Sequence, residues 1–151
     1  MLIFYIFLPI LLLLTSYFFG LPLYKKRPIL IKRVGLIIYS FVLIMTLSPL
    51  LGLWAYVAAI AVVLFLYLLN MWFVFGVTTT MLSDALQKAT LVTRTPVDKP
   101  ADRYRIDNSM EIRFRSLGRV TNLILFKTIN KSKKAELARV VFKKFIQNYF
   151  I

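Results

Sequence analysis

The first half of the chain is a series of apolar runs separated by short polar breaks. Residues 2–24 carry no charge, and the run is longer than the roughly 20 helical residues that cross the hydrocarbon core of a bilayer. Two further apolar runs follow, with a turn that contains proline and glycine between them. The pattern predicts three transmembrane helices, at about 2–24, 34–47 and 53–77, within a membrane domain that covers residues 1–77.

The first apolar run has two interpretations, a retained span and a cleaved signal peptide. A signal peptide has a basic segment before a shorter apolar core and a small-residue cleavage site. Bulky residues and prolines fill the end of this run and no cation precedes it, so we expect it to be retained. Five cations follow within residues 25–33, and the positive-inside rule places such a loop in the cytoplasm. We therefore expect a multi-pass protein of the cell inner membrane, with its N-terminus outside and its C-terminus cytoplasmic.

A different pattern begins after Gly76, where the apolar runs give way to mixed segments. Residues 110–115 alternate strictly between apolar and charged side chains, as a strand with one buried face does. The pattern predicts a short helix at 81–88, strands at 89–95, 110–115 and 119–129, and an amphipathic helix at 132–149. The expected fold class is a multi-pass α-helical membrane domain (three transmembrane helices) followed by a small cytosolic α+β domain over residues 78–151.

The composition restricts the chemistry of this second domain. The chain has 151 residues, a formal net charge of +14 and neither cysteine nor histidine. Disulfides, thiolate zinc sites and the commonest near-neutral general base are therefore excluded. No phosphate-binding glycine loop, dinucleotide fingerprint or zinc motif occurs in the sequence either. We expect a protein that is not an enzyme, with no catalytic residue, no metal and no cofactor.

The excess positive charge points to an anionic partner such as phosphate, nucleic acid or acidic lipid. Arg113 and Arg115 share one face of a predicted strand, and the returning strand brings further polar side chains near them. The candidate anion-binding residues are Arg103, Arg105, Arg113, Arg115, Arg119, Asn122 and Lys127, with Asn122 as a hydrogen-bonding partner for a base or ribose. The alternative is a solvated strand face that Glu111 partly neutralises. The cations of the terminal helix fit either a ligand or the anionic lipids of the inner leaflet.

In layout, the chain resembles the small CRISPR-associated membrane effectors of type III systems. The resemblance is carried by the five-cation loop at 25–33, the strand with Arg113 and Arg115, and the return strand from Arg119 to Lys127. It implies a cytosolic domain that binds cyclic oligoadenylate, in particular cyclic tetra-adenylate. It also implies a homo-oligomer, with a tetramer as one option, whose domain signals to the helices to perturb or permeabilise the membrane in antiviral defence.

Two other functions are compatible with the same residues. One is a non-sensing, membrane-anchored adaptor or assembly subunit whose basic face binds a partner protein, nucleic acid or acidic lipids. The other is a passive small channel that needs no soluble ligand. A stoichiometric partner recovered from native membranes favours the adaptor, whereas liposome leakage that does not depend on an anionic ligand favours the channel.

Overall fold

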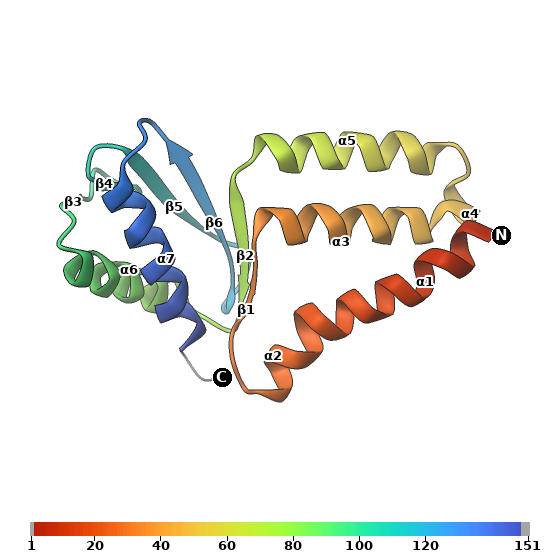
Figure 1. The fold of residues 1–151 in the computed structure, drawn as a ribbon, viewed down its shortest axis with the longest axis horizontal. Helices are drawn as coiled ribbons and strands as arrows, with labels where there is room; N and C mark the ends of the chain where they lie inside the picture. Colours follow the sequence, from red (N-terminus) through yellow and green to blue (C-terminus); the bar gives the residue numbers. More distant parts are fainter. Residues whose placement is uncertain (1, 149–151) are drawn as a thin grey trace.

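The strands of the chain pair into one antiparallel sheet of six strands, in the order β1-β2-β6-β5-β4-β3 (Figure 1). The computed structural model describes residues 2–148. The strands are β1 (Ile29–Ile31), β2 (Met71–Phe75), β3 (Val97–Asp98), β4 (Tyr104–Ile106), β5 (Met110–Ser116) and β6 (Thr121–Thr128). The helices are α1 (Leu2–Thr15), the π-helical segment η1 (Ser16–Gly20), α2 (Leu21–Tyr24), α3 (Arg33–Thr46), α4 (Ser48–Leu51), α5 (Trp54–Leu68), α6 (Thr79–Thr93) and α7 (Lys133–Gln147).

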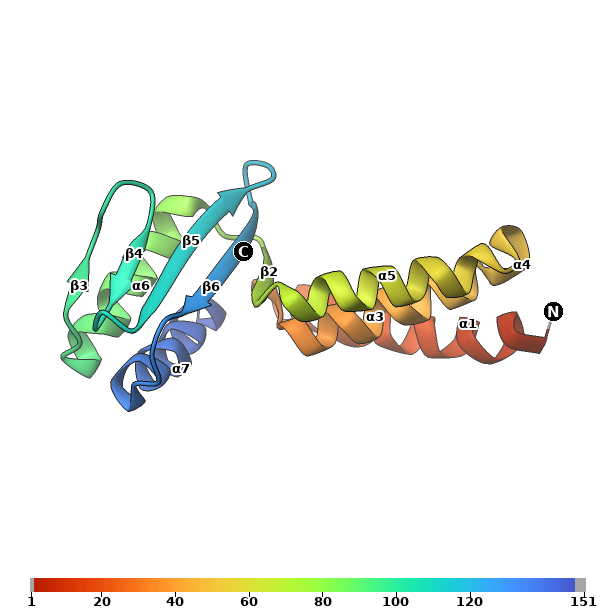
Figure 2. The ribbon, with the colours of Figure 1, turned by 90° about the horizontal axis from the view of Figure 1, so that it is seen from above.

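Helices α6 and α7 lie on one face of the sheet and enclose the main core with it (Figures 1 and 2). Alternate residues of the central strands point into this layer, among them Trp72, Ile112 and Ile124. Leu86 of α6 and Phe142 of α7 meet them from the other side, and all five side chains are at most 2% exposed. The strands expected at 110–115 and 119–129 correspond to β5 and β6, and the expected terminal helix corresponds to α7.

Side-chain caps begin the two covering helices. The hydroxyl of Thr78 accepts a hydrogen bond from the backbone N–H of Met81 at the start of α6, and Ser132 does the same for Ala135 at the start of α7, as N-caps do. The strand expected at 89–95 is wrong, because α6 continues to Thr93. Its buried residues recur at helical rather than strand spacing; they are Leu82, Ala85, Leu86, Ala89 and Thr90.

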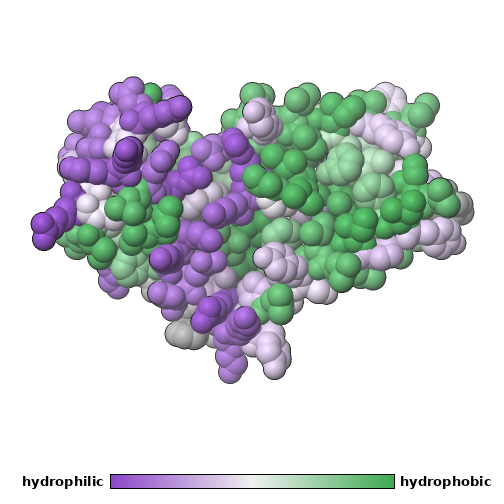
Figure 3. Space-filling model, viewed as in Figure 1, coloured by the Kyte–Doolittle hydropathy of each residue, from purple (hydrophilic) through white to green (hydrophobic). Residues whose placement is uncertain are grey.

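Helices α1, α3 and α5 run alongside one another and extend away from the sheet, with α3 between the other two (Figures 1 and 2). We call the helical segments 2–24 and 33–68 the arm. The arm joins the sheet directly, since β1 leads into α3 through Lys32 and α5 leads into β2 through Leu69 and Asn70. Hydrophobic side chains gather over the arm and hydrophilic ones over the sheet and along the junction (Figure 3).

The expectation of a multi-pass domain with three transmembrane spans is wrong. Helix α3 has 14 residues and α5 has 15, which at about 1.5 Å per residue gives roughly 21–23 Å, short of the about 30 Å of a bilayer core. The predicted third span at 53–77 stops at Leu68, and its last part forms β2 in the sheet. The fold is a compact α+β arrangement in which strands from the first half of the chain complete the sheet of the second half.

Within residues 2–148, one helical stretch is long and apolar enough to cross a membrane by length and composition. It is the continuous segment Leu2–Tyr24, which has 23 residues and a mean hydropathy of 2.3, and none of its apolar window is buried against the rest of the chain. A single membrane anchor and a signal sequence both have these properties. The structure therefore supports one N-terminal apolar helix in place of the predicted multi-pass topology.

Candidate anion-binding surface

The sheet has a second face, opposite α6 and α7 (Figure 2). The arginines of β5 lie on that face, because they alternate with core residues along the strand. Because side chains alternate along a strand, Glu111, Arg113 and Arg115 share this face. In the paired strand β6, Leu125 lies opposite Arg113 and Leu123 lies opposite Arg115. We call the surface formed by Phe73, Arg105, Glu111, Arg113, Arg115, Leu123, Leu125 and Lys127 the open face.

The open face is divided into a charged stripe along β5 and an apolar stripe along β6 and β2. Arg113 and Arg115 are exposed, whereas Leu123, Leu125 and Phe73 are half-buried. Phe73 lies opposite Leu123 in the pairing of β2 with β6. Neighbouring strands are about 4.8 Å apart, so Arg115 and Phe73, which both lie opposite Leu123, are roughly 10 Å apart across the sheet. The surface offers cations and apolar area side by side.

Two acidic residues lie on this face of the sheet, Asp98 opposite Arg105 and Glu111, which two arginines contact. Its Oε1 accepts a hydrogen bond of 3.1 Å from Nη2 of Arg105, and its Oε2 lies 3.6 Å from Nη1 of Arg103. The hydrogen bond from Arg105 holds the pKa of the Glu111 carboxyl below its ordinary value, and burial opposes this effect. Glu111 therefore offsets one of the two positive charges of Arg103 and Arg105 and weakens their attraction for an external anion.

The remaining predicted cations are available to a ligand. Within residues 2–148, Arg113, Arg115, Arg119 and Lys127 take part in no ion pair within 4.0 Å. Lys127 lies directly opposite Glu111 at the far end of the same face. Arg119 is exposed in the turn between β5 and β6, next to the end of the strand that carries Arg115. The structure thus brings four of the predicted cations together along one hairpin.

Asn122 lies on the core face of the sheet and not on the open face. It is fully buried, and its Nδ2 donates a 2.6 Å hydrogen bond to the backbone O of Val77. This placement could be predicted from the sequence, because Asn122 lies two and four residues before the core residues Ile124 and Phe126 and alternate residues of a strand share a face. A ligand on the open face therefore has no contact with Asn122.

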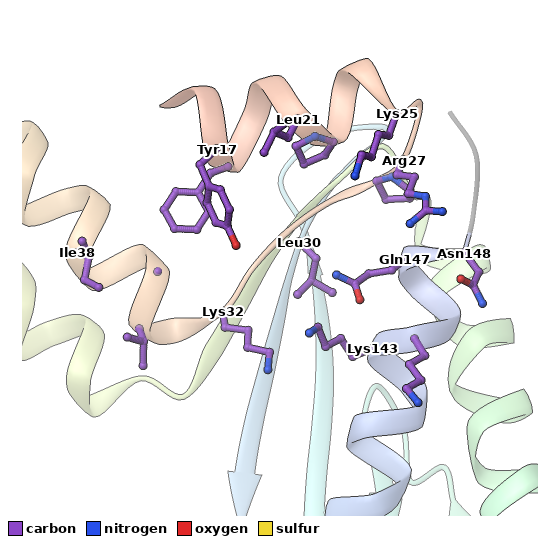
Figure 4. Close-up of a pocket in the computed structure, with 16 residues that line it drawn as sticks. Tyr17, Leu21, Lys25, Arg27, Leu30, Lys32, Ile38, Lys143, Gln147 and Asn148 are labelled. Atoms are coloured by element: carbon purple, nitrogen blue, oxygen red, sulfur yellow. The ribbon is translucent and has the colours of Figure 1, made fainter. Parts of the chain in front are cut away.

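A second group of cations, which the sequence analysis did not bring together, lies where the arm meets α7. Lys32, which precedes α3, and Lys143 of α7 lie beside each other there, although they are far apart in the chain (Figure 4). The charge of Lys143 contributes to holding the pKa of Lys32 below its ordinary value, after a larger contribution from burial. The residue pattern within one segment cannot predict that Lys32 and Lys143 lie close together, because their proximity depends on the pairing of β1 with β2.

Among the residues that the structure describes, no three or more histidine, cysteine, aspartate or glutamate side chains gather in a group that is able to hold a metal ion.

Comparison of the chain with protein-family models, with curated proteins and with solved structures found no match.

Proposed function

We propose that this chain is a membrane-anchored receptor whose open face binds a phosphate-bearing oligonucleotide, with cyclic tetra-adenylate as the expected ligand. The observation that carries the proposal is the pair of exposed arginines at i and i+2 on β5, which form no ion pair within the described residues. Their Cα atoms are about 6.8 Å apart on an extended strand. Two guanidinium groups at that spacing can contact two neighbouring phosphates, and each can bind in a bidentate manner.

The apolar stripe supports an oligonucleotide in preference to a simple phosphate ion. Proteins that bind single strands combine a cationic track for the backbone with aromatic side chains on which bases stack. Phe73 provides an aromatic side chain beside the arginines, Leu123 and Leu125 add apolar surface, and each of the three is half-buried and so already ordered by its neighbours. A nucleotide that places its phosphates on β5 has its bases over β6 and β2.

The proposed anchor is the helix formed by residues 2–24, with its N-terminus outside and the sheet on the cytoplasmic side of the cell inner membrane. The cations at 25–33 directly follow this helix and favour that orientation. Because α3 and α4 both contact α1, the α3–α5 hairpin lies alongside the proposed anchor. Exposed apolar side chains cover the hairpin, among them Ile38, Phe41, Leu64 and Phe65.

The connections between sheet and arm give the receptor a route to the membrane. β1 and β2 pair with each other at one side of the sheet, and they continue into α3 and from α5 with one and two intervening residues. A ligand that prefers one arrangement of the sheet, or of several copies of it, shifts the population of the hairpin by its difference in affinity for the two states. The proposed output is a perturbation of the bilayer.

The test is equilibrium binding of cyclic tetra-adenylate to the full chain in detergent at moderate salt. We expect binding to the natural chain and a loss of about tenfold or more per arginine in R113Q/R115Q, because a hydrogen bond to a charged group contributes about 1.5–3 kcal/mol. K133Q/K134Q, which removes the same charge from the start of α7, is the matched control. Equal affinity in the two variants contradicts the proposal. Recovery of a stoichiometric protein partner without nucleotide binding points to the adaptor.

A further inference from the structure

A pocket of about 790 Å³ opens where the arm meets α7 (Figure 4). Its cations come from two distant parts of the chain. Lys25, Arg27 and Lys32 lie between the end of α2 and the start of α3, and Lys143 and Lys144 lie near the end of α7. The pocket is separate from the open face, since none of its lining residues belongs to β5 or β6.

The other wall of the pocket is apolar and belongs to the proposed anchor. Tyr17, Phe18 and Leu21 line it from η1 and α2, which form the last turns of the 23-residue apolar helix. Leu21 is 48% exposed and Tyr17 is 63% exposed, so apolar area remains available within the pocket. Cations and apolar side chains thus meet at the level where the apolar helix gives way to the basic loop.

Positive charge dominates the described lining of the pocket. None of the described residues that line it is acidic, and Lys32 and Lys143 also line a neighbouring pocket together with Glu136 and Arg139. Burial and the charge of Lys143 hold the pKa of Lys32 below its ordinary value. Two ammonium groups that lie side by side repel each other, and an anion between them offsets that repulsion.

We propose that this junction pocket binds an anionic phospholipid of the surrounding leaflet. The headgroup phosphate lies between Lys32 and Lys143, and an acyl chain runs along Phe18 and Leu21. A free phosphate has no apolar group to contact the apolar wall, whereas a phospholipid contacts both the cations and the apolar side chains of the pocket. A bound lipid connects the anchor helix to α7, and through α7 to the core of the sheet. This inference rests on the proposed anchor and is independent of nucleotide binding.

The test is the lipid that remains with the full chain after mild detergent extraction from vesicles of equimolar phosphatidylglycerol and phosphatidylcholine. Mass spectrometry measures the ratio of the two retained lipids. We expect phosphatidylglycerol to be enriched in the natural chain, and the enrichment to fall by about fivefold for each cation removed in K32Q/K143Q. K133Q/K134Q, on the same helix but outside the pocket, should keep the enrichment. No enrichment in the natural chain, or equal enrichment in both variants, overturns the proposal.

A competition experiment with the natural chain needs no variant and separates the two sources of phosphate. Soluble glycerol phosphate carries the headgroup charge without acyl chains, so it should fail to displace the retained phosphatidylglycerol. Displacement by glycerol phosphate overturns the lipid assignment. An alkaline carbonate wash of the vesicles separates this outcome from a failure of the anchor. A chain that stays on the membrane without lipid preference overturns the pocket alone, whereas a chain that is released overturns the anchor.

Discussion

The amide Nδ2 of Asn122 donates a 2.6 Å hydrogen bond to the backbone O of Val77, and both residues are fully buried. This bond ties the beginning of β6 to the segment that joins β2 to α6. A second bond, from the N–H of Gly76 to the O of Val120, holds the same segment to the β5–β6 turn. The hairpin that bears the arginines is therefore fixed to the strand that continues into the arm.

The first prediction concerns this buried bond. Replacement of Asn122 by alanine should lower the free energy of unfolding by about 1–3 kcal/mol, because the carbonyl of Val77 is left buried without its partner. The variant should keep its affinity for cyclic tetra-adenylate, since Asn122 does not face the ligand. Thermal unfolding and a binding titration check both parts, and a folded N122A protein with strongly reduced affinity contradicts the assignment.

The second prediction concerns the pH dependence of stability. The pKa of Glu111 is lower in the folded chain than in the unfolded one, chiefly through its hydrogen bond with Arg105. Its stabilising contribution is therefore complete above about pH 4.3, the ordinary glutamate pKa, and is lost as the pH falls toward the folded value. Unfolding should show a steeper loss of stability below that pH in the natural chain than in E111Q. Parallel pH profiles of stability in the natural chain and E111Q would exclude a contribution of ionised Glu111 to stability.

The third prediction uses the same residue to test the charge of the open face. Glu111 engages Arg103 and Arg105, so E111Q releases both guanidinium groups and removes one negative charge near the ligand. We expect affinity for cyclic tetra-adenylate to rise by about two- to fivefold, the scale of a screened charge interaction. The binding titration should be repeated at high salt, where the gain should shrink. If E111Q is folded and its affinity for cyclic tetra-adenylate is lower than that of the natural chain, the ligand does not bind at the open face.

The fourth prediction concerns the membrane topology. The natural sequence has no cysteine, so a single cysteine can be introduced at Leu50, in α4 at the tip of the α3–α5 hairpin and 85% exposed. If residues 2–24 form the single span, L50C should stay unlabelled by a membrane-impermeant maleimide outside intact cells, and should be labelled once detergent is added. S116C, at the end of β5, should react in inverted vesicles. Labelling of L50C from outside intact cells would show that the hairpin crosses.

Alternation of charged and apolar residues was sufficient to predict β5, because one face of that strand is buried and the other contains charged side chains. β6 was predicted from its many β-favouring residues, since its open face includes Leu123 and Leu125. The same reasoning failed at β2. Its residues Met71–Phe75 are all apolar, with Trp72 and Val74 in the core and Phe73 half-buried on the open face. No polar residue interrupts the run after Asn70, so the pattern alone cannot distinguish the end of a helix from the start of a strand.

The candidate site was predictable only where a single hairpin contains it. Arg113, Arg115 and Lys127 belong to paired strands, and their shared face follows from parity. The same alternation along β6 places Asn122 on the core face and therefore excludes it from the ligand site, although an asparagine suits a nucleotide contact. The ion pairs of Glu111 with Arg103 and Arg105 depend on the β4–β5 pairing, and the meeting of Lys32 with Lys143 depends on the whole tertiary fold.

The salt dependence of cyclic tetra-adenylate binding tests the central claim most directly. For single strands, the slope of log affinity against log salt concentration is roughly −0.7 per phosphate contact. The natural chain should bind with a clear negative slope, and R113Q/R115Q should reduce its magnitude by about 1.4, the value for two lost phosphate contacts, while K133Q/K134Q leaves it unchanged. Absence of binding at moderate salt, or identical slopes in the natural chain and R113Q/R115Q, would contradict the proposed role of the open face.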